Sequence, residues 1–175
     1  MREVIDAHEA QDGQLMLPVA VTLSILAVLV AIATLLGHRA NTEEIILQTR
    51  ATDQWALFQA KNIRLHEMQG IADLLDTLSP VDKEKAEALR EKYRKETERY
   101  EKEKEEVNEQ AQELEKGREL VGRRTDRYEA GEVILEIALI ICSLTLLTKK
   151  RIFWFSGIVL GLIGLGTTLS GFLIH

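Results

Sequence analysis

Two runs of 23 residues without a charged side chain limit most strongly what this chain can fold into. Leu15–Gly37 reads LMLPVAVTLSILAVLVAIATLLG, and Ile152–Ile174 reads IFWFSGIVLGLIGLGTTLSGFLI. A helix of about 20 apolar residues spans the hydrocarbon core of a bilayer, so each run is long enough to be a transmembrane helix. The first run is too long for a signal peptide and follows an acidic tail, residues 1–14, which favours an uncleaved anchor.

A third apolar segment, Val133–Thr148, is shorter and contains Glu136. Only Lys149, Lys150 and Arg151 separate it from the last apolar run, which predicts a tight helical hairpin in the membrane. The aromatic side chains that follow this basic triplet, among them Trp154, are typical of the headgroup interface. We therefore expect an all-α membrane protein with three transmembrane helices.

The middle of the chain, residues 38–132, is nearly continuous charge. Arg39–Glu132 holds 18 basic and 23 acidic residues, a net charge of −5 with both signs interleaved. This pattern offers no basic patch for nucleic acid. Near residues 78–82, Ser79 is a suitable helix cap and Pro80 a suitable first helical residue, which predicts a turn between two helical arms.

The second arm has a strict seven-residue repeat. Few other apolar residues occur there, so the spacing predicts a coiled-coil seam packed on a partner helix. The seam consists of Ala86, Tyr93, Tyr100, Val107, Leu114, Val121 and Tyr128. The register continues past Leu135, Ala138 and Cys142, which predicts one helix from about Val81 to Thr148. The first arm, Asn41–Leu78, completes a long antiparallel helical hairpin, with pairing to neighbouring subunits as the alternative.

Small residues occupy one face of the last apolar run. They let helix backbones approach closely, as in G-x-x-x-G contacts. The face consists of Gly157, Gly161, Gly164, Thr168 and Gly171. Its partner is either the chain's own second apolar segment or a neighbouring subunit.

Glu136 is the candidate intramembrane polar site, because an ionisable group inside a membrane segment indicates a functional role by default. The alternative is that it reaches the nearby interface, since Glu132 lies one turn away. In either case we expect its side chain to face protein or water.

The residue pattern contains no catalytic or cofactor motif. There is no nucleotide-binding loop, no G-x-S-x-G and no H-E-x-x-H. The single cysteine, Cys142, excludes an internal disulfide and a multi-cysteine metal site. His66 and Glu67 lack a second ligand one turn away, so a solvated helix face is favoured over a metal site. We expect no enzymatic activity, no cofactor, no metal and no small-molecule substrate.

The stretch RATDQWALFQAKNIRLHE, Arg50–Glu67, resembles a signature of the bacterial membrane-protein family catalogued as domain of unknown function 4337. The segments LLGHRANTEEIILQT, Leu35–Thr49, and LTKKRIFWF, which ends at Phe155, are similar to that family as well. The resemblance implies a multi-pass protein of the bacterial inner membrane and carries no activity.

These patterns predict a structural or interaction protein that associates through its coil and its glycine-rich helix, either with itself or with another membrane protein. The alternative is a subunit of a small oligomeric channel or transporter. The short basic loop Lys149–Arg151 favours a non-cytoplasmic coil, whereas the acidic N-terminus favours the reverse.

Overall fold

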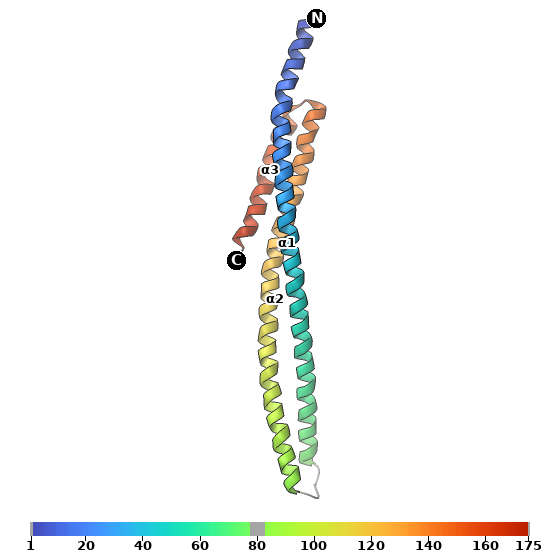
Figure 1. The fold of residues 1–175 in the computed structure, drawn as a ribbon, viewed down its shortest axis with the longest axis vertical. Coiled ribbons are helices and arrows are strands. Elements are labelled where there is room, and N and C mark those ends of the chain that lie inside the picture. Colours follow the sequence, from blue (N-terminus) through green and yellow to red (C-terminus); the bar gives the residue numbers. More distant parts are fainter. Residues whose placement is uncertain (1, 78–82, 175) are drawn as a thin grey trace. The chain divides into compact units, whose positions relative to one another are not determined.

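The computed structural model describes residues 2–77 and 83–174, which are almost entirely helical (Figure 1). Helix α1 spans Arg2–Thr77, α2 spans Lys83–Thr148 and α3 spans Arg151–Ser170, and a short 3-10 helix, η1, spans Gly171–Leu173. The described residues contain no strand. The predicted all-helical class is confirmed. The predicted turn at Ser79 and Pro80 lies outside the described residues.

Each of the three long helices is long and apolar enough to cross a membrane by its length and composition. α1 contains Pro18, which lacks the amide hydrogen that a helix normally uses. The Thr22 hydroxyl donates a hydrogen bond of 2.8 Å to the Pro18 carbonyl, so a side chain supplements the hydrogen bonding of the backbone there. α2 is one unbroken helix from Lys83 to Thr148, so the single helix predicted from about Val81 to Thr148 is confirmed over the described residues.

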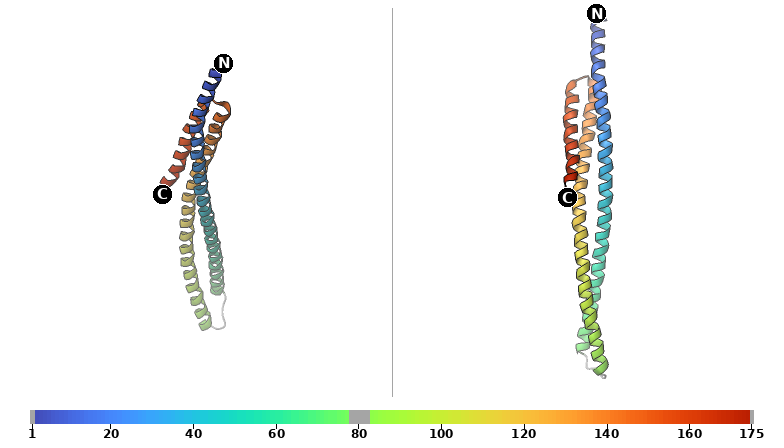
Figure 2. Two further views of the ribbon diagram at one scale, coloured as in Figure 1. Left: turned by 45° about the horizontal axis from the view of Figure 1, so that its top comes forward. Right: turned by 60° about the vertical axis from the view of Figure 1, so that its left-hand side comes forward.

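The chain divides into two compact units. Met1–Glu44 and Glu119–His175 form the three-helix unit, and Ile45–Arg118 form the two-helix unit. In the three-helix unit, α3 lies beside the end of α2, as the views of Figures 1 and 2 show. Its core is a cluster of Val19, Leu26, Ala33, Leu135, Ala138 and Cys142.

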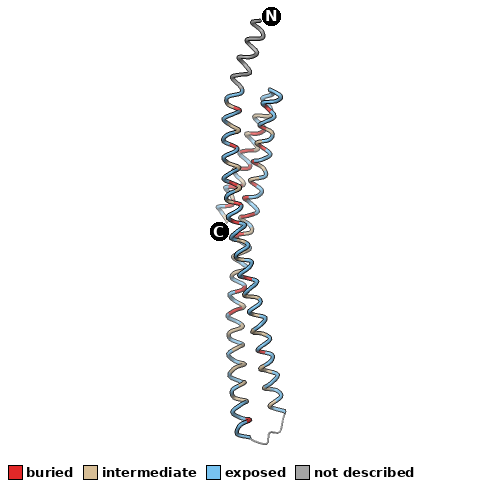
Figure 3. The backbone as a smooth tube through the Cα atoms, turned by 45° about the vertical axis from the view of Figure 1, so that its right-hand side comes forward, coloured by how far each residue is buried: buried red, intermediate tan, exposed pale blue. Residues whose placement is uncertain are grey.

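The two-helix unit pairs a segment of α1 with a segment of α2. Gln54 donates to Gln110 at 3.4 Å, Lys61 is paired with Glu103, and Arg90 donates to the Leu75 carbonyl at 2.6 Å. Residue numbers rise along α1 as they fall along α2, so the two segments run in opposite directions where they touch. Buried residues are sparse along both segments (Figure 3) and include Ala51, Leu65, Val107 and Ala111.

A two-residue connection joins α2 to α3. Lys149 has a φ of 56°, in the left-handed region that lysine rarely adopts. Its amide donates a hydrogen bond of 2.8 Å to the Thr145 carbonyl, which closes the last turn of α2. The chain therefore reverses direction at the basic triplet that the sequence marked as a hairpin loop.

Candidate functional site: the three-helix packing and the coil seam

The small face of α3 is buried against α2 of the same chain. A side-chain β-carbon added at Gly157 would lie 2.8 Å from the Cys142 β-carbon and 3.1 Å from the Ala138 carbonyl oxygen. One added at Gly164 would lie 3.0 Å from the backbone nitrogen of Leu135. The two backbones approach so closely that larger residues do not fit. Of the two partners that the sequence left open, the chain's own second segment occupies this face.

The contact continues to the end of α3. A β-carbon at Gly171 would lie 2.6 Å from the Tyr128 ring, and that ring meets Phe172 edge-on with centroids 5.6 Å apart. Arg124 donates a hydrogen bond of 2.8 Å to the carbonyl of Ile174. Thr168, which is also buried, lies opposite Gly131 of α2. All five residues of the predicted small face are therefore buried.

The opposite end of the three-helix unit is held by Trp154. Its indole nitrogen donates a hydrogen bond of 3.0 Å to the Thr22 hydroxyl of α1. Its ring lies 5.2 Å from that of Phe155, centroid to centroid. A partly buried tryptophan combines a large apolar contact with one directional hydrogen bond, which fixes the orientation of its ring. The hydroxyl of Thr22 thus links α1 to α3.

A seven-residue repeat of core residues in α1 was not predicted from the sequence. Val19, Leu26 and Ala33 recur every seven residues and face the core, with Val19 and Ala33 fully buried. Gly161 of α3 fits against Leu26, whose Cδ2 would lie 2.7 Å from an added β-carbon. In a run where almost every residue is apolar, these positions do not stand out by residue type.

Glu132, which the sequence reasoning used only as a neighbour of Glu136, makes a polar contact inside the three-helix unit. The Thr34 hydroxyl of α1 donates to its carboxylate at 2.5 Å and also to the Val30 carbonyl at 3.0 Å. The side chain of Glu132 is half-buried. The carboxylate of Glu132, directly before the second apolar segment, is thereby hydrogen-bonded across two helices, which is favourable for a partly buried polar group.

Glu136 lies in the part of α2 that packs against α3, between Tyr128 and Cys142. It lies eight residues from Tyr128, or about 12 Å along the helix, and about 18 Å from Thr148. Because Tyr128 packs beside the end of α3, the three-helix contact extends one turn or more beyond Val133. Glu136 is exposed, and among the residues that the structure describes it has no hydrogen-bond or ion-pair partner.

The predicted coil seam is buried or half-buried at all seven positions. In the two-helix unit, Val107 is its most buried member, and Tyr93 and Tyr100 are half-buried. Sequence reasoning missed Ala111, which is fully buried four residues after Val107. A second buried position four residues after the first is a regular feature of helix packing. An alanine at such a position is hard to recognise from the sequence, because alanine is also common on exposed helix faces.

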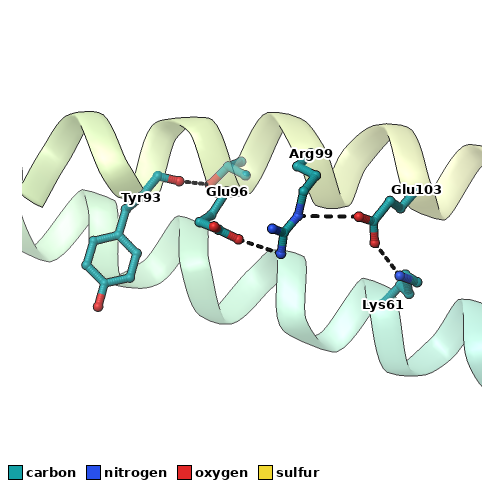
Figure 4. A network of polar contacts seen from close by, with 6 residues as sticks. Lys61, Tyr93, Glu96, Arg99 and Glu103 are labelled. Atoms are coloured by element: carbon teal, nitrogen blue, oxygen red, sulfur yellow. Dashed lines mark hydrogen bonds and ion pairs between the residues drawn. The ribbon is translucent and has the colours of Figure 1, made fainter.

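An ion-pair network borders this seam (Figure 4). Arg99 contacts Glu96 at 2.7 Å and Glu103 at 3.3 Å, and Lys61 of α1 reaches the other oxygen of Glu103. The hydrogen bond from Lys61 lowers the pKa of Glu103, opposed by desolvation and assisted by both positive charges. The Arg99 guanidinium also lies 4.9 Å from the centre of the Tyr100 ring. Here charged side chains join the two helices of this unit.

His66 lies on the exposed side of α1 in the two-helix unit. Its ring nitrogen Nδ1 lies 3.2 Å from the side-chain oxygen of Gln69. Within the described ranges, no group of three histidine, cysteine, aspartate or glutamate residues lies close enough to hold a metal ion. The structure therefore places His66 in a local helix-surface contact.

Comparisons with known proteins give one match. A family model described as a domain of unknown function (DUF4337) matches residues 15–174. Neither the curated proteins nor the solved structures contain a match. The matched range includes every packing contact described above, from Val19 to Ile174. The chain therefore belongs to the family of domain of unknown function 4337.

Proposed function

We propose that this chain is a non-enzymatic structural or interaction protein, anchored in the bacterial inner membrane by three transmembrane helices. In this proposal, the segments flanking residues 78–82 form an antiparallel coiled-coil hairpin that presents a surface to a partner. The chain interacts with the lipid bilayer, and with further copies of itself or another membrane protein.

One observation carries this proposal. α2 is a single helix whose buried and half-buried positions include a series spaced three and four residues apart from Val107 to Thr145. A continuous helix transmits position and rotation along its length, which suits a stalk whose surface must be tied to an anchor. No catalytic motif in the sequence competes with this role.

The packing of α3 bears on which surface joins two copies of the chain. The sequence predicted that the glycine face of α3, with Gly157, Gly161 and Gly164, takes part in self-association. In the structure, α2 and Leu26 of α1 already cover this face within one chain. We therefore place contacts between subunits in the coil, whose charged and apolar faces remain exposed.

The test is the mass of the purified full chain in lipid nanodiscs, combined with in-cell crosslinking of photoreactive residues placed at exposed coil positions. We expect an oligomer, or a defined crosslinked partner that copurifies with the chain. A strictly monomeric protein that crosslinks to nothing in cells would contradict the proposal.

The compartment of the coil needs its own test. Introduced cysteines at Ser79 and Lys150 are labelled in intact cells with a reagent that does not cross the membrane. With the coil outside the cytoplasm, Ser79→Cys is labelled and Lys150→Cys is protected until the membrane is opened. The reverse labelling would place the partner in the cytoplasm.

A second candidate function rests on Glu136. Its exposed carboxyl lies on a face with Val133, Ile137 and Ile140, where an unpartnered charge in lipid is unfavourable. In an oligomeric channel or transporter, Glu136 would line the path between subunits. Ion flux into liposomes is then reduced by Glu136→Gln and unaffected by the neighbouring Ile137→Leu. No flux, or equal flux for all three proteins, would contradict this role.

A further inference from the structure

In the two-helix unit, one face of α1 carries no formally charged residue and is exposed along its length. Ala51 and Leu65 on the opposite face are buried against α2, whereas Ile63 is 60% exposed. The uncharged residues recur at spacings of three, four and seven, which places them on one side of a helix. We call this face the outer stripe: Ile45, Thr49, Thr52, Ala56, Gln59, Ile63, His66 and Gly70.

The charges of this unit favour the outer stripe as the surface that meets another copy. The exposed face of α2 includes a row of acidic residues, Glu101, Glu105, Glu109 and Glu113, with basic residues such as Lys102 beside it. Two copies that met along this acidic row would repel each other, because like charges that face each other across helices are unfavourable. The outer stripe brings no like charges together.

The end of the stripe is hollowed. A groove of 480 Å³ is lined by His66, Glu67, Gly70, Ile71, Leu74 and Leu75. A β-carbon added at Gly70 would meet nothing within 4 Å, so no contact within the chain requires a glycine there. Glycine is among the least favourable residues inside a helix. A neighbouring helix that approaches at this point would account for both the hollow and the glycine.

We propose that the outer stripe is the docking surface for a second copy of this chain, with α1 packed against α1 in parallel around a two-fold axis. The inference rests on the proposed function, because copies anchored in one membrane in one orientation carry their α1 helices in the same direction. The stripe extends over about 40 Å of helix, or nearly four heptads, which is long enough for a coiled-coil contact.

The flanking residues fit this parallel arrangement. In a parallel pair, the residue before Thr49, Ala56, Ile63 or Gly70 faces the residue five positions later on the partner helix. Gln48 then faces Asp53, and Asn62 faces Glu67, in each case an amide opposite a carboxylate. The arrangement creates no pair of like charges along the stripe.

Disulfide crosslinking tests the contact in the full chain reconstituted in lipid nanodiscs. Ala56→Cys is expected to form a dimer under mild oxidation. Glu109→Cys, exposed on α2 of the same unit, is the matched control and is expected to remain monomeric. The unsubstituted protein reports the background from Cys142, which is buried. Crosslinking at Glu109→Cys and not at Ala56→Cys would overturn the proposed surface.

Charge substitution supplies a second, independent measurement. Ile63→Glu places two carboxylates at the centre of the stripe and is expected to weaken dimerisation at least tenfold in analytical ultracentrifugation. Leu57→Glu, on an exposed side of α1 outside the stripe, is expected to leave dimerisation unchanged, and circular dichroism checks that both variants remain helical.

The outcomes separate the two proposals. An oligomer that is unaffected by Ile63→Glu keeps the proposed function and overturns this surface. A chain that is monomeric but captures a different membrane protein in cells does the same. A monomer without a partner contradicts both.

Discussion

The three-helix unit and the two-helix unit both have a buried or half-buried residue every seven positions along α1 or α2, but they fill the space around those residues differently. In the three-helix unit, Gly157 and Gly164 bring two backbones into contact, so the fit depends on the absence of side chains. In the two-helix unit, Val107 and Leu65 are buried among half-exposed charged neighbours such as Lys61.

In the proposed function, the three-helix unit lies in the membrane and the two-helix unit lies in water, and the difference follows from these surroundings. Between apolar helices in lipid, the hydrophobic effect supplies little attraction, so close packing of small residues and interhelical hydrogen bonds must hold them. In water, a narrow apolar seam supplies the attraction, and flanking charges keep the surface soluble and select the partner. Steric changes should therefore affect the first unit most, and changes in burial or charge the second.

The largest expected effect comes from Gly164→Leu, because its side chain would collide with the backbone of Leu135. We expect a loss of about 3 kcal/mol of unfolding free energy, at the upper end for overpacked sites. Gly166→Leu on the same helix is the control, since an added β-carbon there meets nothing within 4 Å. Thermal unfolding in detergent measures both, and equal losses would show that the close fit does not hold the helices together.

Leu65→Ala should destabilise the two-helix unit by about 2 kcal/mol, since it deletes a side chain that is 3% exposed. Leu57→Ala, at a position that is 44% exposed on the same helix, should change the unfolding free energy by less than about 0.5 kcal/mol. Urea unfolding followed by circular dichroism compares the two. A greater loss at Leu57 would mean that another surface of α1 forms the core.

Thr145→Val should stabilise the three-helix unit by up to about 1 kcal/mol. The Thr145 hydroxyl is buried and has no hydrogen-bond partner among the described residues, so a methyl group of the same shape removes an unsatisfied polar group. The melting temperature in detergent is the measurement. A lower melting temperature would indicate that the hydroxyl has a partner, such as a water molecule or a neighbouring subunit.

The smallest effect concerns pH and the two-helix unit. Lys61 lowers the pKa of Glu103 below its ordinary value of 4.5, so the folded state favours the ionised carboxylate. Its contribution is therefore present above pH 4.5 and is lost as the pH falls through the lowered pKa. Melting temperatures between pH 7 and pH 3 should fall less for Glu103→Gln than for the unsubstituted chain. Identical pH profiles would exclude a contribution from this pair.

A packing seam could be predicted from the sequence only where its residues differ in type from the residues around them. Val107 and Tyr100 stood out because charged residues surround them, and the glycines of α3 stood out among large apolar residues. Val19 and Leu26 are equally regular in spacing but lie in a uniformly apolar run, where nothing distinguishes a core residue from a lipid-facing one. Helical periodicity is informative only when the other face differs in composition.

Contacts between segments far apart in sequence were beyond sequence reasoning for a different reason. The hydrogen bond between Thr34 and Glu132 depends on how α1 and α2 are aligned along their axes, and a repeat of seven is compatible with several alignments. The contact between Tyr128 and Gly171 was not foreseen for a similar reason, because it depends on how α2 and α3 are aligned along their axes.

The left-handed conformation of Lys149 shows two requirements in conflict at one residue. Glycine adopts this conformation freely, whereas any other L-amino acid incurs a cost of about 1–2 kcal/mol. A glycine would suit the backbone but would remove one of three adjacent positive charges from the shortest loop between two apolar segments. Positive charge in short loops decides which side of a membrane they remain on during insertion. In the proposed membrane anchor, lysine at this turn thus has a less favourable backbone conformation than glycine would, but it keeps a positive charge that acts during membrane insertion.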